Sequence, residues 1–314
     1  MGDYHDLGEL RLDGCVLTVG AFDGVHRGHQ ALLRELVAGA RANRLPSVVL
    51  TFYPHPSVVL RGRRPSYYIT LPEEKAELIR AQGVDHVVTQ RFDRAFSLIT
   101  AAEFLDRILA QWKMQHIWAG EDFAFGHDRQ GNLAFLREIG GRRGFTVHVV
   151  PPLHLEGEVV SSTRVREALR SGDVARAARY LGRRFSLRGV VRRGAGRGRQ
   201  LGIPTANLEI AEERAVPGPG VYACRAEVET GRFRAVTNIG IRPTFADDLP
   251  KPVVETHLLG FDADLYGQEL RLEFVDRLRD ERRFPGPEAL REQIGRDIRR
   301  AEEILAGEKE GVDV

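Results

Sequence analysis

Two histidines lie in a glycine-rich segment near the start of the chain. His26 and His29 flank Gly28, and Gly20 and Gly24 precede them. Glycines remove side chains from a turn, so a polyphosphate can approach the N–H groups and the positive dipole of a helix N-terminus. Histidine donates hydrogen bonds to phosphate oxygens and can carry charge near neutral pH. The segment therefore predicts a site for transfer at an α-phosphorus, which needs positioning and charge stabilisation more than covalent help.

A second polar segment, residues 161–167, opens an expected helix late in the same half of the chain. The hydroxyls of Ser162 and Thr163 are good helix caps. The same helix N-terminus could hold a phosphate with Arg166 as a clamp, because a guanidinium forms paired hydrogen bonds to phosphate oxygens. Alone, the segment also fits an ordinary capped helix. Together with the two histidines, it favours a nucleotide-binding domain.

The most informative stretch of the second half, residues 189–207, combines glycines, arginines and a Pro-Thr-Ala-Asn sequence. The chain has no Gly-Lys pair, which excludes a P-loop, but successive backbone N–H groups can still cradle phosphates. The candidate ATP-binding residues are Gly194, Gly196, Arg197, Gly198, Arg199, Thr205 and Asn207. Thr205 and Asn207 also offer oxygen ligands for Mg²⁺. The arginine run could instead bind nucleic acid, although it lacks interleaved aromatic residues for base stacking.

The elements that must position these residues differ between the two halves. From residue 14 to about 180, short apolar runs alternate with amphipathic stretches. We expect strands at 16–19, 47–52, 86–88, 116–119 and 145–150, and helices at 29–42, 72–81, 101–112 and 133–139. This alternation predicts an α/β, Rossmann-like nucleotidyltransferase domain with a parallel sheet and helices on both faces. Such sheets bind ligands beyond the carboxyl ends of their strands.

After residue 185 the apolar runs become short and are separated by turn signals. Runs at 223–228, 233–239, 253–259 and 270–274 predict a small antiparallel β-barrel, and 287–305 a closing helix. The two domains should join near residues 181–183. We expect a nucleotidyltransferase domain at 1–182 and a barrel domain at 183–314.

Composition limits the class of protein. At 314 residues the chain exceeds the usual size of one domain, and its net charge is +2. Lysine occurs only four times, so nearly all positive charge is arginine. Cys15 and Cys224 lie in apolar runs and are expected to be buried spectator thiols. Residues 1–10 carry acidic residues and no apolar core, so we expect no signal peptide there. No apolar run reaches membrane-spanning length, and we expect a cytoplasmic protein.

Several motifs of the first half resemble one enzyme family. Gly-x-Phe-Asp-Gly-x-His-x-Gly-His at 20–29, Thr-Phe-x-Pro-His-Pro at 51–56 and Gly-x-Asp-Phe-x-Phe-Gly at 120–126 are similar to motifs of bacterial bifunctional riboflavin kinase/FAD synthetases. The resemblance implies an adenylyltransferase with His26 and His29 as catalytic residues. It implies ATP contacts from Gly20, Phe22, Asp23, Gly28, Ser162, Thr163 and Arg166. It implies a nucleotide and flavin cleft that includes Asp122, Arg129 and His55.

One of these assignments has an alternative, and three aromatic residues of the same motifs are not assigned to the ligand. His55, between two prolines, is equally a rigid-turn residue or a contact on the flavin side. The aromatic residues Phe52, Phe123 and Phe125 are expected to pack in the core and not to contact the ligand.

The second half resembles the riboflavin kinase part of the same family. Gly-Arg-x-Leu-Gly-x-Pro-Thr-Ala-Asn at 198–207 and Val-Glu-x-His at 254–257 match its motifs, with Ile203 where phenylalanine is common and Gly260 where aspartate is common. The resemblance implies Glu255 as the catalytic base, with Mg²⁺ on Thr205 and Asn207. It also places Arg279 near the flavin or nucleotide, although a salt bridge at a helix end fits that residue nearly as well.

The resemblance covers roughly residues 14 to 305 and implies two linked reactions. The barrel would phosphorylate riboflavin with ATP to FMN, and the first domain would adenylylate FMN with a second ATP to FAD and pyrophosphate. The partners would be small molecules, with no nucleic acid and no membrane. Two alternatives remain: a nucleotidyltransferase with another acceptor, such as nicotinamide mononucleotide or phosphopantetheine, and a regulatory module whose barrel grips RNA.

Overall fold

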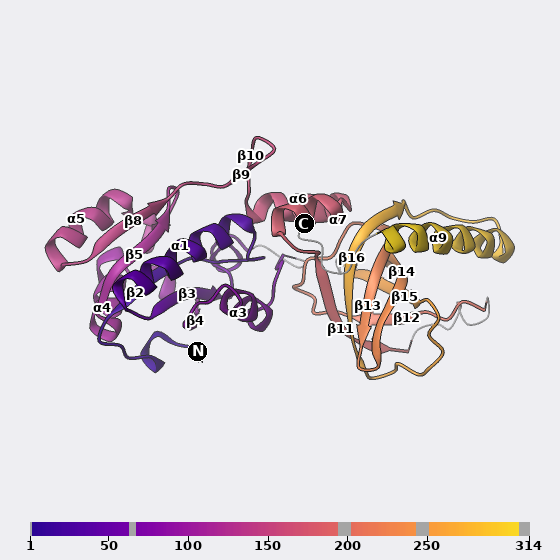
Figure 1. Ribbon diagram of the computed structural model, residues 1–314, viewed down its shortest axis with the longest axis horizontal. Coiled ribbons are helices and arrows are strands. Elements are labelled where there is room, and N and C mark those ends of the chain that lie inside the picture. Colours follow the sequence, from indigo (N-terminus) through magenta and orange to yellow (C-terminus); the bar gives the residue numbers. More distant parts are fainter. Residues whose placement is uncertain (1, 63–66, 194–201, 243–250, 308–314) are drawn as a thin grey trace. The chain divides into compact units, whose positions relative to one another are not determined.

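A computed structural model of the chain describes residues 2–62, 67–193, 202–242 and 251–307 (Figure 1). The chain forms two compact units, Met1–Ser162 and Thr163–Val314. The expected domain boundary at 182/183 stays a prediction, since compactness alone does not say where each activity begins.

The first unit is built on a six-stranded parallel sheet with the order β1-β4-β3-β2-β5-β8. The strands in that order are Gly2–Tyr4, His86–Arg91, Ser47–Tyr53, Cys15–Val19, Met114–Gly120 and Thr146–Val150. The helices are α1 (Arg27–Asn43), α2 (Pro56–Arg61), α3 (Pro72–Arg80), α4 (Ala101–Trp112) and α5 (Leu133–Arg143). The predicted parallel α/β domain is confirmed. Strand β1 and helix α2 are additional elements that the hydrophobic pattern did not indicate, because both are short.

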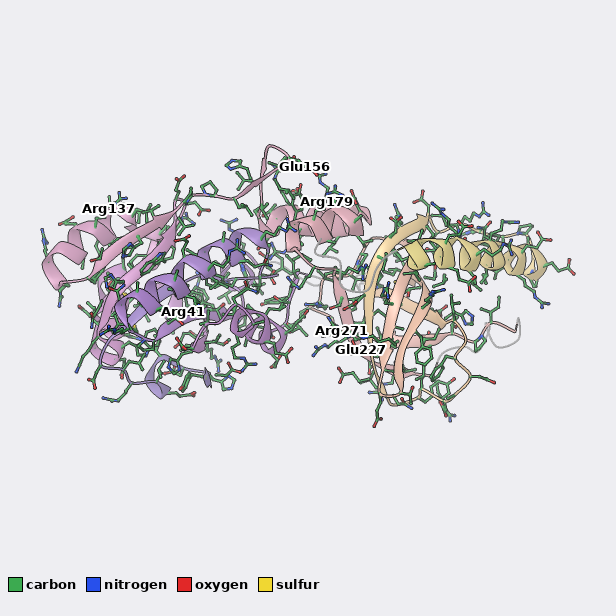
Figure 2. The ribbon with its side chains drawn as sticks, in the orientation of Figure 1. Arg41, Arg137, Glu156, Arg179, Glu227 and Arg271 are labelled. Carbon is green, nitrogen blue, oxygen red and sulfur yellow. The ribbon has the colours of Figure 1, made fainter. Side chains whose placement is uncertain are left out.

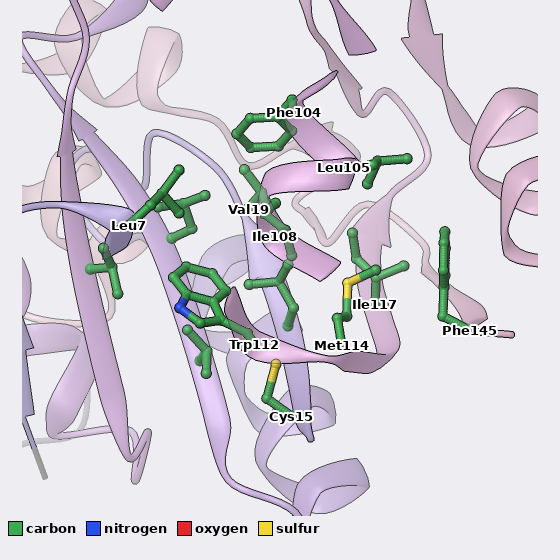
Figure 3. Packing of buried hydrophobic residues seen from close by; sticks show 14 of the residues in the cluster. Leu7, Cys15, Val19, Phe104, Leu105, Ile108, Trp112, Met114, Ile117 and Phe145 are labelled. Atoms are coloured by element: carbon green, nitrogen blue, oxygen red, sulfur yellow. The ribbon is translucent and has the colours of Figure 1, made fainter. Parts of the chain in front are cut away.

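The residues of β2 alternate between two cores, one on each face of the sheet. Cys15, Leu17 and Val19 face one cluster together with α4, and Val16 faces the other together with α1 and α3. Figure 3 shows Trp112 of α4 packed in the first cluster beside Cys15. The helices therefore cover both faces, and the carboxyl ends of the strands form an edge where a ligand can bind.

The second unit contains α6 (Ser162–Ser171), α7 (Val174–Leu181) and a closed six-stranded barrel. Its strands, in barrel order, are β11 (Ser186–Arg192), β12 (Ala206–Glu209), β15 (Lys251–Leu258), β14 (Gly231–Arg242), β13 (Gly220–Val228) and β16 (Glu269–Arg279). Every recorded pairing between these strands is antiparallel, as predicted. The barrel closes because β11 pairs with both β12 and β16.

Helix α9 (Pro287–Gly307) packs on the outside of the barrel, where it buries Ala301 and Leu305 against Val221 and Val236. Charged residues occupy other parts of the outer surface. Glu227 and Arg271 stand opposite one another on β13 and β16, with 3.4 Å between the carboxylate and the guanidinium (Figure 2). The predicted barrel with a closing helix is thus confirmed.

Candidate active sites

The turn that follows β2 has an unusual backbone. Phe22 and Val25 adopt left-handed conformations, with φ of 50° and 39°, and Gly24 has φ of 82°. A side chain at Gly24 would start 2.9 Å from the Ile69 side chain, so glycine is needed for space as well as for conformation. Gly20 continues the sheet by donating its N–H to the Leu50 carbonyl at 3.0 Å. Left-handed residues other than glycine persist only where the surroundings hold them.

Asp23 is one of the groups that hold this turn. Its buried carboxylate accepts hydrogen bonds from the backbone N–H groups of Ile69 and Thr70, each at 3.0 Å. The Thr70 hydroxyl in turn accepts the Gly24 N–H at 2.9 Å. Asp23 therefore ties the turn to residues 69–70, and its expected contact with ATP stays a prediction.

The two histidines come together at the N-terminus of α1. His26 caps the helix, and its Nδ1 accepts the His29 N–H at 3.3 Å. The two rings are stacked, with 3.6 Å between their centroids and 17° between their planes. Gly28 leaves room for this stack, because an added Cβ would lie 3.2 Å from the His26 ring. The His-x-Gly-His spacing thus places two imidazoles and a helix N-terminus at the carboxyl end of the central strand β2.

The second predicted motif begins at the same turn. The Ser162 hydroxyl donates to the Asp23 carbonyl at 2.8 Å, so the sequence pairing of the two motifs corresponds to a direct contact. Thr163 is exposed and Arg166 is buried on α6, in the second compact unit. Their expected phosphate contacts stay predictions.

Lys75 on α3 contacts the start of this turn. Sequence analysis did not predict it as a residue of the site. Its buried ammonium donates to the carbonyls of Ala21 at 3.2 Å and Phe52 at 3.0 Å. Burial lowers the pKa of Lys75 to about 8, and the nearby Asp23 carboxylate opposes that shift. The sequence could have indicated its burial, because Lys75 stands one turn before Ile79 and therefore lies on the same, apolar face of the helix.

The residues expected at the flavin side of the cleft are more exposed. Asp122 and Arg129 are both exposed, and an Arg129 Nη2 donates to the Asp122 backbone carbonyl at 3.5 Å. Phe52, Phe123 and Phe125 pack against the core, as expected. The assignments of Asp122 and Arg129 to the ligand cleft stay predictions.

His55 begins helix α2. Its Nδ1 accepts the Ser57 N–H at 3.0 Å, and its own backbone N–H donates to the Tyr68 hydroxyl at 2.8 Å. These contacts agree with the role of a rigid-turn residue. A flavin contact by the other ring nitrogen stays a prediction.

The barrel places Glu255 in the middle of a polar row. In the strand register, Glu255 of β15 stands opposite Asn207 of β12 on one side and Asn238 of β14 on the other. Side chains directly opposite one another on antiparallel strands have Cβ atoms only about 5 Å apart. The neighbouring Thr256 faces the buried side, where its hydroxyl lies 2.9 Å from that of Thr237. A half-buried carboxylate flanked by two amides is the result.

His257 connects the row to the Pro-Thr-Ala-Asn segment. Its Nδ1–H donates to the Pro204 carbonyl at 2.7 Å, which holds the residue just before Thr205. The Thr205 hydroxyl, the Asn207 amide oxygen and the Glu255 carboxylate are hard oxygen donors of the kind that Mg²⁺ accepts. Asn238 stands in the same row but was not predicted as a site residue from the sequence. The register between β14 and β15 is what brings it beside Glu255.

Arg279 is held by a buried salt bridge. Its guanidinium contacts the Asp297 carboxylate of α9 through three hydrogen bonds of 2.8 to 3.0 Å, and Gln293 donates to the same carboxylate at 2.7 Å. Arg279 therefore forms a salt bridge, but it lies at the end of β16 and its partner lies in the middle of α9, not at a helix end. The flavin contact stays a prediction. The remaining residues of the glycine-rich loop lie outside the described residues: Gly194, Gly196, Arg197, Gly198 and Arg199.

Two protein-family models match consecutive parts of the chain. The FAD synthetase model matches residues 9–164, and the riboflavin kinase model matches residues 181–305. The two matches do not overlap: the first contains the turn at 20–29, and the second contains Asn207, Asn238 and Glu255.

Curated relatives resemble the whole chain. A bifunctional riboflavin kinase/FMN adenylyltransferase of Pseudomonas fluorescens is 42% identical over 93% of this chain and 94% of its own length. Proteins of the same name from Bacillus subtilis and Escherichia coli are each 36% identical. The B. subtilis match covers 91% of both chains, and the E. coli match covers 96% of both.

A solved structure shares the complete fold. The crystal structure of a macrolide-efflux protein from Streptococcus pneumoniae superposes with a TM-score of 0.87 at 30% identity, covering 98% of this chain and 99% of that one. Within residues 2–62, 67–193, 202–242 and 251–307, no helix has both the length and the apolar character needed to cross a membrane.

Proposed function

The chain belongs to the bifunctional riboflavin kinase/FMN adenylyltransferase family, and from this we propose how its own residues divide the two reactions. The protein has riboflavin kinase and FMN adenylyltransferase activities and makes FMN and FAD. The observation that carries this function is the presence of both family matches, one after the other, in a single chain. We assign adenylyl transfer to residues 1–182 and riboflavin phosphorylation to residues 183–314.

In adenylyl transfer, an oxygen of the FMN phosphate attacks the α-phosphorus of ATP, and pyrophosphate leaves. His26 and His29 would donate hydrogen bonds to the phosphate oxygens on which negative charge builds up. The stack of their rings at the start of α1 supports this role, because it directs both imidazoles to one place beside the helix N-terminus. Ser162, Thr163 and Arg166 would bind the polyphosphate, with Gly20, Phe22, Asp23 and Gly28 forming the turn beneath it.

In the kinase reaction, the terminal ribityl hydroxyl of riboflavin attacks the γ-phosphorus of ATP, and ADP leaves. Glu255 would accept the hydroxyl proton as general base. The flanking Asn207 and Asn238 support this assignment, because their amides can orient the carboxylate and the hydroxyl. The glycine-rich loop with Arg197 and Arg199 would hold the phosphates, and Arg279 would lie at the flavin end.

Mg²⁺ fits the oxygen donors of the barrel site. Thr205 and Asn207 would hold it there, and the ion when bound neutralises charge on the transferring phosphate. The hydrogen bond between His257 and Pro204 keeps the Thr205 segment beside Glu255. We also propose that the protein acts on small molecules without nucleic acid, since the arginine run lacks the aromatic residues that stack on bases.

The function is tested by separating flavins chromatographically after incubation of the protein with riboflavin, ATP and Mg²⁺. We expect FMN to appear first and FAD second. His29→Ala should stop the reaction at FMN, because it removes one of the two imidazoles from the adenylyl site. FMN alone from the unaltered protein would contradict the adenylyltransferase assignment, and no flavin product would favour a nucleotidyltransferase with another acceptor.

A further inference from the structure

Lys75, one of only four lysines in this arginine-rich chain, is buried. Lys75 is 5% exposed, whereas the side chain of Lys113 in the same unit is 64% exposed. Burying an ammonium is unfavourable unless it is matched by hydrogen bonds or opposite charge. The lowered pKa of Lys75 reflects that cost, which is opposed in part by Asp23. Such a residue is unfavourable for stability alone, so its position beside the catalytic turn calls for a functional explanation.

Lys75 bridges the ends of two neighbouring parallel strands. Ala21 follows β2, and Phe52 lies in the last part of β3; the Lys75 ammonium donates to both carbonyls. The Thr51 hydroxyl donates to the same Ala21 carbonyl at 3.0 Å. Two donors from different elements therefore hold one peptide group of the turn.

The geometry of that peptide group has a consequence for the site. A trans peptide is planar, with its C=O and N–H on opposite sides. Because Lys75 and Thr51 hold the Ala21 carbonyl, the Phe22 N–H of the same peptide points away from them. Phe22 itself is in the left-handed conformation, which requires support from its surroundings. Lys75 and Thr51 thus both hold the peptide group through which the main chain enters the turn that carries His26.

We infer that Lys75 is a positioning residue for adenylyl transfer, whose ammonium holds the turn at residues 20–26 in the conformation that meets the ATP phosphates. This inference rests on the proposed function of that turn. Lys75 acts through the backbone of Ala21 and Phe52 and need not touch ATP. Its removal should slow the transfer step more than it weakens FMN binding.

The test is Lys75→Met, which keeps the length of the side chain and removes its charge. For FAD formation from added FMN, we expect kcat to fall by about 10- to 100-fold, as a misplacement of about 1 Å can produce. The KM for FMN should change by less than about threefold, since uniform binding is retained. FMN formation from riboflavin is the internal control and should be unchanged. Lys113→Met, at the exposed lysine paired with Asp13, is the matched control and should leave both reactions unchanged.

The folding of the first unit is measured in the same experiment. Both tryptophans of the chain, Trp112 and Trp118, are buried in that unit, so their fluorescence reports its unfolding. Loss of FAD formation with an equal or higher unfolding midpoint supports the inference. An unchanged kcat, or a loss that accompanies a lower midpoint, would overturn it in favour of no role or a structural role.

A second variant, Thr51→Val, tests the same peptide group from its other donor. We expect a smaller fall in kcat for FAD formation, with FMN formation unchanged; no fall would contradict the idea that the Ala21 carbonyl must be held.

The unaltered protein is assayed first. If it forms no FAD from FMN, the proposed function of the site fails, which is a different result from a failure of the Lys75 variants.

Discussion

Glu255 illustrates how one residue obtains its chemistry from its neighbours on adjacent strands. It is half-buried between Asn207 and Asn238, whereas Glu209, only two residues beyond Asn207 on β12, is exposed and paired with Arg192. Both are strand glutamates in the same barrel. Glu255 stands directly opposite Asn207, whereas Glu209 stands opposite Val190 of β11, so these two residues provide a matched comparison.

Replacing the proposed base should therefore separate the two activities. For Glu255→Gln we expect kcat for FMN formation from riboflavin to fall by about 10²- to 10⁴-fold, the range that general-base catalysis contributes. FAD formation from added FMN should be unchanged. Glu209→Gln is the control and should retain both activities. Retention of FMN formation by Glu255→Gln would remove Glu255 from the role of base.

The lowered pKa of Lys75 also leads to a prediction of how the stability of the first unit depends on pH. Its pKa is lowered from 10.5 to about 8 in the folded protein, so between these values the unfolded chain binds more protons than the folded one. The free energy of unfolding should rise with pH across the window from about 8 to 10.5, by roughly 3 kcal/mol for this group. Urea unfolding followed by tryptophan fluorescence should show that rise in the unaltered protein and a smaller one in Lys75→Met. Equal pH dependence in the two proteins would contradict the assignment.

At the scale of elements, helix α9 is attached to the barrel by both apolar and ionic contacts. Ala301 and Leu305 pack on β13 and β14, and Asp297 pairs with Arg279 of β16. Asp297 is 5% exposed, and the side chain of Arg279 is 19% exposed. A buried pair of this kind adds little net stability, but removal of one partner leaves an uncompensated charge.

Asp297→Asn should therefore destabilise the second unit by about 3 kcal/mol, because Arg279 loses its counter-charge. Thermal inactivation is the measurement: the temperature at which FMN formation is lost should fall, while that for FAD formation from FMN should not. Asp262→Asn, a substitution of the same kind in the barrel unit at an exposed site, is the control. If the two variants lose kinase activity at the same temperature, the salt bridge does not stabilise the unit.

At the scale of the whole molecule, each compact unit contains one cysteine. Cys15 and Cys224 are free and fully buried, as expected, and their role as spectator thiols stays a prediction. Burial raises the pKa of each thiol to about 12, so neither forms the reactive thiolate at neutral pH.

The number of cysteines that react with a thiol reagent should therefore report how many of the two units have unfolded. We expect no rapid reaction in the native protein and reaction of two thiols after complete denaturation. If the units unfold separately as denaturant is raised, a plateau of one reacted thiol should appear, and peptide mapping would identify which cysteine reacted. Rapid modification of either thiol in the native protein would contradict its burial.

Much of this protein could be predicted from local sequence patterns. Apolar residues with a period of two or 3.6 mark the strands and helices, because a side chain's face follows from its position in the element. The turn at 20–29 and the segment at 161–167 were identified from their residue types, since the residues of each motif are adjacent in the chain. The contact between Ser162 and Asp23 agrees with the pairing of these two motifs.

Only the tertiary structure decided which distant residues meet. The row of Asn207, Glu255 and Asn238 depends on the register of three strands, and a shift of one residue would move Glu255 to the buried face. Lys75 reaches Ala21 and Phe52 because a parallel sheet brings the carboxyl ends of β2 and β3 together while α3 packs against them. Sequence periodicity carries no information on such pairings, because they are determined by how the elements pack in three dimensions.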